Sequence, residues 1–186
     1  MKGLTVKSER GGAFDTRRVT TLALLVCVAL IAGLVENAFP PLMPLAPGAK
    51  LGLGNIAPLL ALIMLSVGDA YLVMFVKCLL GALASGGVTG LMYSVPSGVL
   101  ALTVEVLLFL LAFDKMSVAM ISLIGAVAFN AAQLGVATAV TGVSMLPLLP
   151  LMMTAGLLAG AFTGLLAYTL IKQTPYSAFR GKNGYK

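Results

Sequence analysis

The sequence predicts an all-α integral membrane protein, a bundle of six transmembrane helices with both termini in the cytoplasm. Of its 186 residues, 60% are hydrophobic and 10% are charged, whereas roughly 25% of residues are charged in an ordinary soluble domain. Residues 116–171 form a run without one charged side chain. A soluble surface cannot be built from such a run, so lipid must be the main solvent.

Charged residues and helix breakers mark the ends of the expected spans, because a helix needs about 20 apolar residues to cross the hydrocarbon. The first span is expected over 19–35, between arginines at 17 and 18 and the glutamate at 36. Prolines at 40, 41, 44 and 47 then predict a loop. The second span is expected over 51–67, and after a tight turn the third runs from 70 to about 84 or 86.

Glycines at 86, 87 and 90 separate the third span from a fourth, expected over 91–113. The fifth is expected over 116–136. The stretch 137–150, with two prolines, predicts a loop or interfacial segment before a sixth span over 151–171. The chain thus divides into a basic cytoplasmic segment at 1–18, a six-helix transmembrane domain at 19–171 and a basic cytoplasmic tail at 172–186.

The basic residues orient the bundle, because lysine and arginine near span ends accumulate in the cytoplasm. In the six-span arrangement Lys50 lies outside, Lys77 lies within the membrane, and ten others lie inside: Lys2, Lys7, Arg10, Arg17, Arg18, Lys115, Lys172, Arg180, Lys182 and Lys186. We therefore expect a multi-pass protein of the cell membrane of a bacterium or archaeon. The alternative, that the first apolar run is a cleaved signal peptide, would leave the basic C-terminus outside.

Composition also bounds the function. The net charge of +6 comes from residues near the two ends, which suits a membrane face better than a nucleic-acid groove, so no nucleic-acid partner is expected. Cys27 and Cys78 fall in apolar runs, which favours reduced packing residues over a disulfide. The chain has no histidine, and neither a metal nor a cofactor is expected.

Small residues indicate where helices approach closely in lipid. The sixth span carries Gly156, Gly160 and Gly164 on one face, which favours packing within the bundle. The first span carries a weaker pattern, formed by Ala23, Cys27, Ala29 and Gly33. For that face, packing within the bundle and contact with a partner helix both remain open.

Two charges, Lys77 and Glu105, lie far from any span end. Each is seven residues from the expected cytoplasmic end of its span, about 10 Å at about 1.5 Å per residue. Because an intramembrane charge needs a partner, the two are expected to form an ion pair. A structural staple is favoured over proton or ion coupling, since no further acids lead away from the pair.

Polar residues from four spans gather near the expected outer face. The candidate ligand-binding residues are Glu36, Lys50, Asn55, Tyr93, Ser94, Asn130 and Gln133. Asn130 and Gln133 share a helix face, where their amides can donate and accept hydrogen bonds. The alternative is that these side chains only bond helices together. The proline-rich loop over 36–50 is expected to lie above them as a lid.

Three motifs carry a family resemblance: Lys-Leu-Gly-Leu-Gly-Asn-Ile-Ala-Pro at 50–58, Lys-Cys-Leu-Leu-Gly at 77–81 and Gly-Ala-Val-Ala-Phe-Asn-Ala-Ala-Gln at 125–133. Over about 19–171 the chain resembles the heptaprenyl diphosphate synthase component I family, also called the Gx transporter family. Such proteins often have histidine where this chain has Phe129. The family is in turn similar to S components of energy-coupling factor (ECF) transporters, six-helix proteins that bind a micronutrient outside the cell.

The resemblance implies a transmembrane coupling subunit and cytoplasmic ATPases as partners. It also implies that Ala23, Cys27, Ala29 and Gly33 face the coupling subunit, while Asn55, Asn130 and Gln133 line a pocket for a small molecule. The leading expectation is therefore a substrate-specificity subunit, S-component-like, for ATPase-coupled uptake.

The alternative is a noncatalytic membrane subunit of an isoprenoid or quinone (heptaprenyl diphosphate) biosynthesis system, and a scaffold without ligand is a third reading. Prenyl-diphosphate synthesis in the chain itself is not expected, because Asp15, Asp69 and Asp114 are isolated and form no magnesium-binding cluster. A Walker-type phosphate-binding loop is also absent from the sequence.

Overall fold

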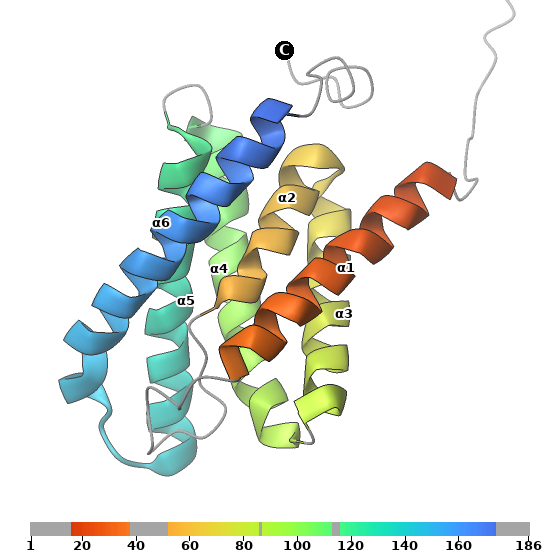
Figure 1. The fold of residues 1–186 in the computed structure, drawn as a ribbon. Coiled ribbons are helices and arrows are strands. Elements are labelled where there is room, and N and C mark those ends of the chain that lie inside the picture. The colour runs from red at the N-terminus through yellow and green to blue at the C-terminus, as the bar shows by residue number, and fades with distance from the viewer. Residues whose placement is uncertain (1–15, 38–51, 86, 113–115, 174–186) are drawn as a thin grey trace, which may run out of the picture.

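The structure is a computed structural model that describes residues 16–37, 52–85, 87–112 and 116–173. Within these residues the elements are all helical, with no β-strand (Figure 1). The helices are α1 (Thr16–Asn37), α2 (Ile56–Met64), α3 (Val67–Ser85), α4 (Val88–Ala112), α5 (Val118–Thr141) and α6 (Leu149–Gln173). Single 3₁₀ turns, η1 (Leu53–Asn55) and η2 (Leu146–Leu148), precede α2 and α6. The expected all-α architecture is confirmed.

The outward faces of the bundle are apolar. Among the described helices, α1, α3, α4, α5 and α6 are long and apolar enough to cross a membrane. Large apolar side chains on their surfaces are exposed, such as Leu83 at 72%, Leu111 at 81% and Leu158 at 74%. In water they would form a patch far larger than a monomeric soluble protein carries. The outward faces of these helices are therefore typical of a membrane helix bundle.

The second span, expected over 51–67, contains a helix much shorter than predicted. Its helix α2 has 9 residues, which cover about 14 Å, roughly half of a hydrocarbon layer of about 30 Å. Before α2, Gly52 adopts the left-handed conformation with φ of 90° and η1 forms a tight turn. After it, Leu65 leaves the helical region with φ of −123° and ψ of −91°. Both breaks occur without a charge or a proline, so the apolar run conceals them.

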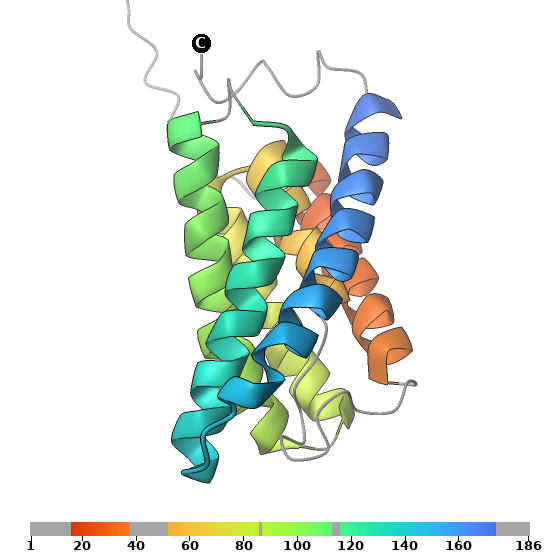
Figure 2. The same ribbon diagram turned by 90° about the vertical axis from the view of Figure 1, so that its left-hand side faces the viewer.

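An ion pair at one end of the bundle fixes the direction of the chain. Arg18, in the first turn of α1, donates from Nε and Nη2 to Oδ1 of Asp69, in the first turn of α3, at 3.1 and 2.6 Å. Because α1 and α3 start at the same end, the segment between them, including α2, returns the chain across the bundle. Figures 1 and 2 show that α6 also finishes at this end.

We call this the termini end, marked by Arg18 and Asp69, and the opposite one the far end, where α1 and α3 finish. The two ends of the described chain therefore lie at the same end of the bundle (Figure 1). An even number of passages, as in the six-span arrangement, also places both termini at one end. The second passage of the chain, however, includes only a short helix.

Short helix α2 forms the centre of the larger core. Residues 56–62 are all buried, and α2 contacts α1, α3, α4 and α6. Pro58 is accommodated because it lies in the first turn, where its missing N–H has no helical partner to lose. The buried residues of α2 are apolar and pack against these four helices, which hold α2 in place.

The expected loop over 137–150 is mostly helical. α5 continues to Thr141, beyond the expected end at 136, and α6 already begins at Leu149. The hydroxyls of Thr138 and Thr141 donate to carbonyls one turn earlier, which lets both residues remain within the helix. α5 ends where Gly142 takes a φ of 69°. The remaining helix ends differ from expectation by less than one turn.

The glycine face of α6 packs against α5. A Cβ on Gly160 would lie 2.8 Å from Cβ of Ala126 and 2.9 Å from Cα of Leu123. The hydroxyl of Ser122 in α5 donates to the carbonyl of Gly160 at 3.2 Å. All three glycines of this face meet α5 at comparably short distances: Gly156, Gly160 and Gly164. The face serves packing within the chain, as the sequence favoured.

Candidate functional site

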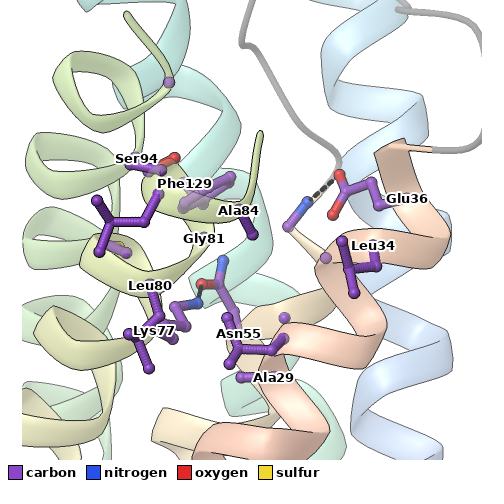
Figure 3. Close-up of a pocket in the computed structure, with 18 residues that line it drawn as sticks. Ala29, Leu34, Glu36, Asn55, Lys77, Leu80, Gly81, Ala84, Ser94 and Phe129 are labelled. Carbon is purple, nitrogen blue, oxygen red and sulfur yellow. Dashed lines mark hydrogen bonds between the residues drawn. The ribbon is translucent and has the colours of Figure 1, made fainter. Parts of the chain in front are cut away.

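A cavity of about 490 Å³ lies toward the far end of the bundle, between α1, η1, α3 and the start of α4 (Figure 3). This volume is within the range of about 300–1,000 Å³ that is usual for small-molecule sites. The last turns of α1 and α3 form two walls, and Phe129 reaches it from α5. Most of its lining is apolar, with polar groups at a few points.

One polar point of the cavity is a lysine and amide pair. Lys77 in α3 donates from Nζ to Oδ1 of Asn55 in η1 (Figure 3). Beside them, Gly54 lies against the backbone of α1, since a Cβ there would be 3.1 Å from the carbonyl oxygen of Ala29. The close approach of η1 to α1 and the bond to Lys77 hold the start of α2 inside the bundle.

A second polar point lies at the end of α1. Glu36, which is 7% exposed, accepts a hydrogen bond from the backbone N–H of Gly52 at 2.8 Å (Figure 3). Glycine is required at 52 for two reasons: its φ is positive, and a Cβ would lie 2.8 Å from Nδ2 of Asn55 and 2.9 Å from the ring of Phe129. Glu36 and Lys77 thus fix the two ends of the same short segment.

The rim of the cavity between α1 and α3 is apolar and faces outward. Leu34 of α1 is 54% exposed, and Leu80 and Leu83 of α3 are 38% and 72% exposed. Side chains with these exposures belong to the surface that lipid covers. On the side between α1 and α3 the cavity is therefore bordered by exposed apolar side chains.

Three of the residues expected to bind a ligand line this cavity: Glu36, Asn55 and Ser94. The cavity also contains residues not expected there, above all Phe129, Lys77 and Gly81. Lys50 and most of the proposed lid, residues 38–50, lie outside the described residues. The sequence could have indicated two of these residues, because Lys77 and Gly81 are four positions apart and therefore lie on one face of the third span.

Tyr93, Asn130 and Gln133 are not among the residues that line the cavity. All are buried, with exposed fractions of 3% for Tyr93 and 0% for both amides. Asn130 donates from Nδ2 to the carbonyl of Ala126 in its own helix, and a Cβ on Gly156 would lie 2.6 Å from that nitrogen. Within the described part of the chain, Oδ1 of Asn130 has no hydrogen-bond partner. Asn130 therefore lies where α5 meets α6.

Glu105 is buried between α4 and α5, at 4% exposure. It faces Gly125, where a Cβ would lie 2.6 Å from Cγ of Glu105. Nζ of Lys77 donates a hydrogen bond to Oδ1 of Asn55. The direct ion pair between Lys77 and Glu105 stays a prediction.

The four small residues expected to meet a partner helix divide between two environments. Ala23 and Cys27 are exposed on α1. Ala29 is 3% exposed and packs inward, and both Ala29 and Gly33 line the cavity. A partner that approached α1 from outside would reach Ala23 and Cys27, while Ala29 is already covered by this chain.

The described residues contain no group of three or more histidine, cysteine, aspartate or glutamate side chains that could hold a metal ion. Among the described residues that line the cavity, the polar side chains are one carboxylate, one ammonium, one amide and one hydroxyl. Such a set can orient a ligand by hydrogen bonds within an apolar space.

Comparison with known proteins gives one finding. The sequence model of the family described as heptaprenyl diphosphate synthase component I matches residues 25–170, which include every described residue that lines the cavity. No curated protein matches the chain.

Proposed function

The chain belongs to the heptaprenyl diphosphate synthase component I family, and we propose that it is a noncatalytic membrane subunit of an isoprenoid or quinone biosynthesis system. In this role its cavity holds an isoprenoid intermediate of that system. The family membership favours this function over uptake by an ATPase-coupled transporter.

The observation that carries the proposal is the exposed apolar rim of the cavity between α1 and α3. An isoprenoid dissolved in the bilayer would approach from the lipid, and exposed Leu34, Leu80 and Leu83 flank the opening through which it would pass. The mostly apolar lining suits a hydrocarbon chain, because burial of apolar surface stabilises by about 25 cal/mol per Å². A water-soluble micronutrient would instead require many more hydrogen bonds.

The test is to identify what copurifies with the full chain. We would extract the protein in mild detergent, extract its bound lipids and analyse them by mass spectrometry. Gly81→Leu should displace the ligand, because Gly81 lines the cavity and the new side chain would occupy open space there. A Cβ at this position meets no atom within 4 Å. Gly135→Leu is the matched control: it is also a helical glycine with open space around it, but lies outside the cavity.

An isoprenoid or prenylated quinone precursor enriched in the unchanged protein and in Gly135→Leu, but lost in Gly81→Leu, would support the proposal. The same enrichment in all three proteins would show lipid bound elsewhere and contradict it.

A second candidate function is an S-component-like subunit that binds a small molecule for uptake through a transmembrane coupling subunit and ATPases. The observation that favours it is short helix α2, which begins inside the bundle beside the cavity, as interrupted helices do at the binding sites of many transporters. It requires both termini in the cytoplasm and a cavity toward the outside. A water-soluble vitamin copurifying in a Gly81-dependent manner would favour this function over the first.

A further inference from the structure

We infer that the cavity takes an uncharged isoprenoid whose polar end is a hydrogen-bond-accepting oxygen such as a carbonyl, and that it does not take the diphosphate group of a prenyl diphosphate. This inference rests on the proposed function and specifies the ligand of the same site. Three observations carry it: the balance of charge, the orientation of one amide and the nature of the walls.

The charges around the cavity do not favour a polyanion. Of the described residues in its lining, Lys77 is the one cation and Glu36 the one anion, so their formal charges cancel. A diphosphate carries several negative charges and is usually held by clustered arginines and lysines or through divalent cations bound by several carboxylates. Here it would meet the carboxylate of Glu36 instead.

The orientation of Asn55 places a donor in the cavity. Because an ammonium group has only donors, the amide must turn its oxygen toward Lys77. Nδ2 is then on the other side of the amide, beside Gly52, which lines the cavity and lies next to the ring of Phe129. Figure 3 shows this nitrogen pointing away from Lys77. A neutral acceptor oxygen can bond it without adding charge.

The walls accept the remainder of such a ligand. Apart from its few polar points, the lining consists of alanine, glycine, leucine and one phenylalanine, with Cys78. Glycines at 33 and 81 leave room along α1 and α3, since a Cβ at either would meet no atom within 4 Å. Branched prenyl units can therefore lie between α1 and α3, with the oxygen at Asn55 and the chain extending toward the leucine rim.

The experiment uses two probes of equal chain length, a tritiated prenyl methyl ketone and the corresponding prenyl diphosphate, with the full chain in lipid nanodiscs. Equilibrium binding of each probe is measured for the unchanged protein, Gly81→Leu and Gly135→Leu. We expect the ketone to bind at least tenfold tighter than the diphosphate. Its binding should be lost in Gly81→Leu and kept in Gly135→Leu.

Two further variants test the chemistry. Asn55→Asp keeps an acceptor for Lys77 but removes the Nδ2 donor, so it should weaken ketone binding about three- to tenfold, the usual range for one hydrogen bond. Glu36→Gln keeps an acceptor for Gly52 and removes the negative charge, so it should strengthen diphosphate binding at least threefold while changing ketone binding less than twofold.

The outcomes separate the two proposals. A diphosphate that binds as tightly as the ketone, and is lost in Gly81→Leu, would overturn the inference of a neutral ligand while leaving the proposed function intact. Absence of binding by both probes would overturn the proposed function as well. Unchanged ketone binding in Asn55→Asp would overturn the role of the amide donor.

Discussion

At the residue scale, a glycine in α5 makes room for the buried carboxyl group of α4. Glu105 has a long polar side chain, and the space for it exists only because position 125 lacks a Cβ. Glycine is usually unfavourable inside a helix by about 1 kcal/mol relative to alanine. At position 125 the gain in helix propensity from an added Cβ would be outweighed by overlap with Glu105.

Gly125→Ala should therefore lower the free energy of unfolding by about 1–3 kcal/mol, the usual cost of overpacking. The measurement is unfolding by sodium dodecyl sulfate in mixed micelles. Gly135→Ala, where a Cβ meets no atom, should be neutral or slightly stabilising. If the carboxyl group causes the effect, Gly125→Ala should cost less than about 0.5 kcal/mol in a Glu105→Ala background.

Lys77 donates a hydrogen bond to Asn55 and is predicted to pair with Glu105, and double-mutant cycles can measure each interaction energy. The cycle of Lys77→Ala with Asn55→Ala should give a coupling energy of about 1.5–3 kcal/mol, as for hydrogen bonds to charged groups. The cycle of Lys77→Ala with Glu105→Ala tests the predicted ion pair, which would give a coupling above about 0.5 kcal/mol. A double change as destabilising as the sum of its single changes would exclude the pair of Lys77 with Glu105.

Sequence reasoning at this scale was limited by what helical spacing can determine. The spacing of Asn130 and Gln133 shows that they share a face, but not which neighbouring helix that face meets. The structure turns Asn130 toward the junction with α6, where Gly156 provides the space, and buries Gln133 completely. Glu36 and Asn55 could be placed in the site because each lies at the end of an apolar run, where few neighbours compete.

At the scale of the helices, close contact between α5 and α6 depends on residues without side chains. Helix association in lipid gains little from the hydrophobic effect, so close backbone approach and interhelical hydrogen bonds must supply it. Gly160 lies against backbone and Cβ atoms of α5 that cannot rotate away, and Ser122 bonds its carbonyl. This contact joins the last helix to the rest of the bundle.

Gly160→Ala should separate α5 from α6 and lower the free energy of unfolding by about 1–3 kcal/mol. The same measurement on Gly135→Ala provides the control, since both positions are helical glycines in the two contacting helices. A variant Gly160→Ala as stable as the unchanged protein would mean that the two helices can move apart at little cost.

The long helices were predictable and the short one was not, for a physical reason. Arginines at 17 and 18 and the glutamate at 36 bracket 19–35, and Asp114 and Lys115 separate 91–113 from 116–136, so these span ends were located closely, whereas the uncharged end of the fifth span was not. The ends of α2 lie within the bundle, where glycine and leucine can change the direction of the chain without contacting water. A hydropathy pattern indicates whether a segment prefers lipid or water, so it cannot detect a turn that the chain makes inside the protein.

At the scale of the whole molecule, the arrangement of the ends makes a prediction about orientation. The start of α1 and the end of α6 lie together at the termini end (Figure 2), and the basic residues of the sequence concentrate beside them. By the positive-inside rule, this end should face the cytoplasm.

Reporter fusions at each terminus should therefore both report the cytoplasm: active for a fluorescent protein, inactive for alkaline phosphatase. Single cysteines in a background lacking Cys27 and Cys78 provide an independent measurement, because a membrane-impermeant maleimide should label a cysteine placed at Gly87 and not one placed at Lys172 in intact cells. Termini on opposite sides would contradict the described arrangement, and labelling of Lys172→Cys alone would reverse the orientation.

Short helix α2 also has a consequence for how the protein is made. The insertion machinery accepts segments by apolar length, and α2 is well below what a span requires. Only Leu65 and Ser66 separate it from α3, so the two should enter the bilayer together as a hairpin. Because α6 covers part of α2, the centre of the bundle is finished last. A chain arrested before α6 is synthesised would leave α2 incompletely covered, and quality-control proteases would be expected to recognise it.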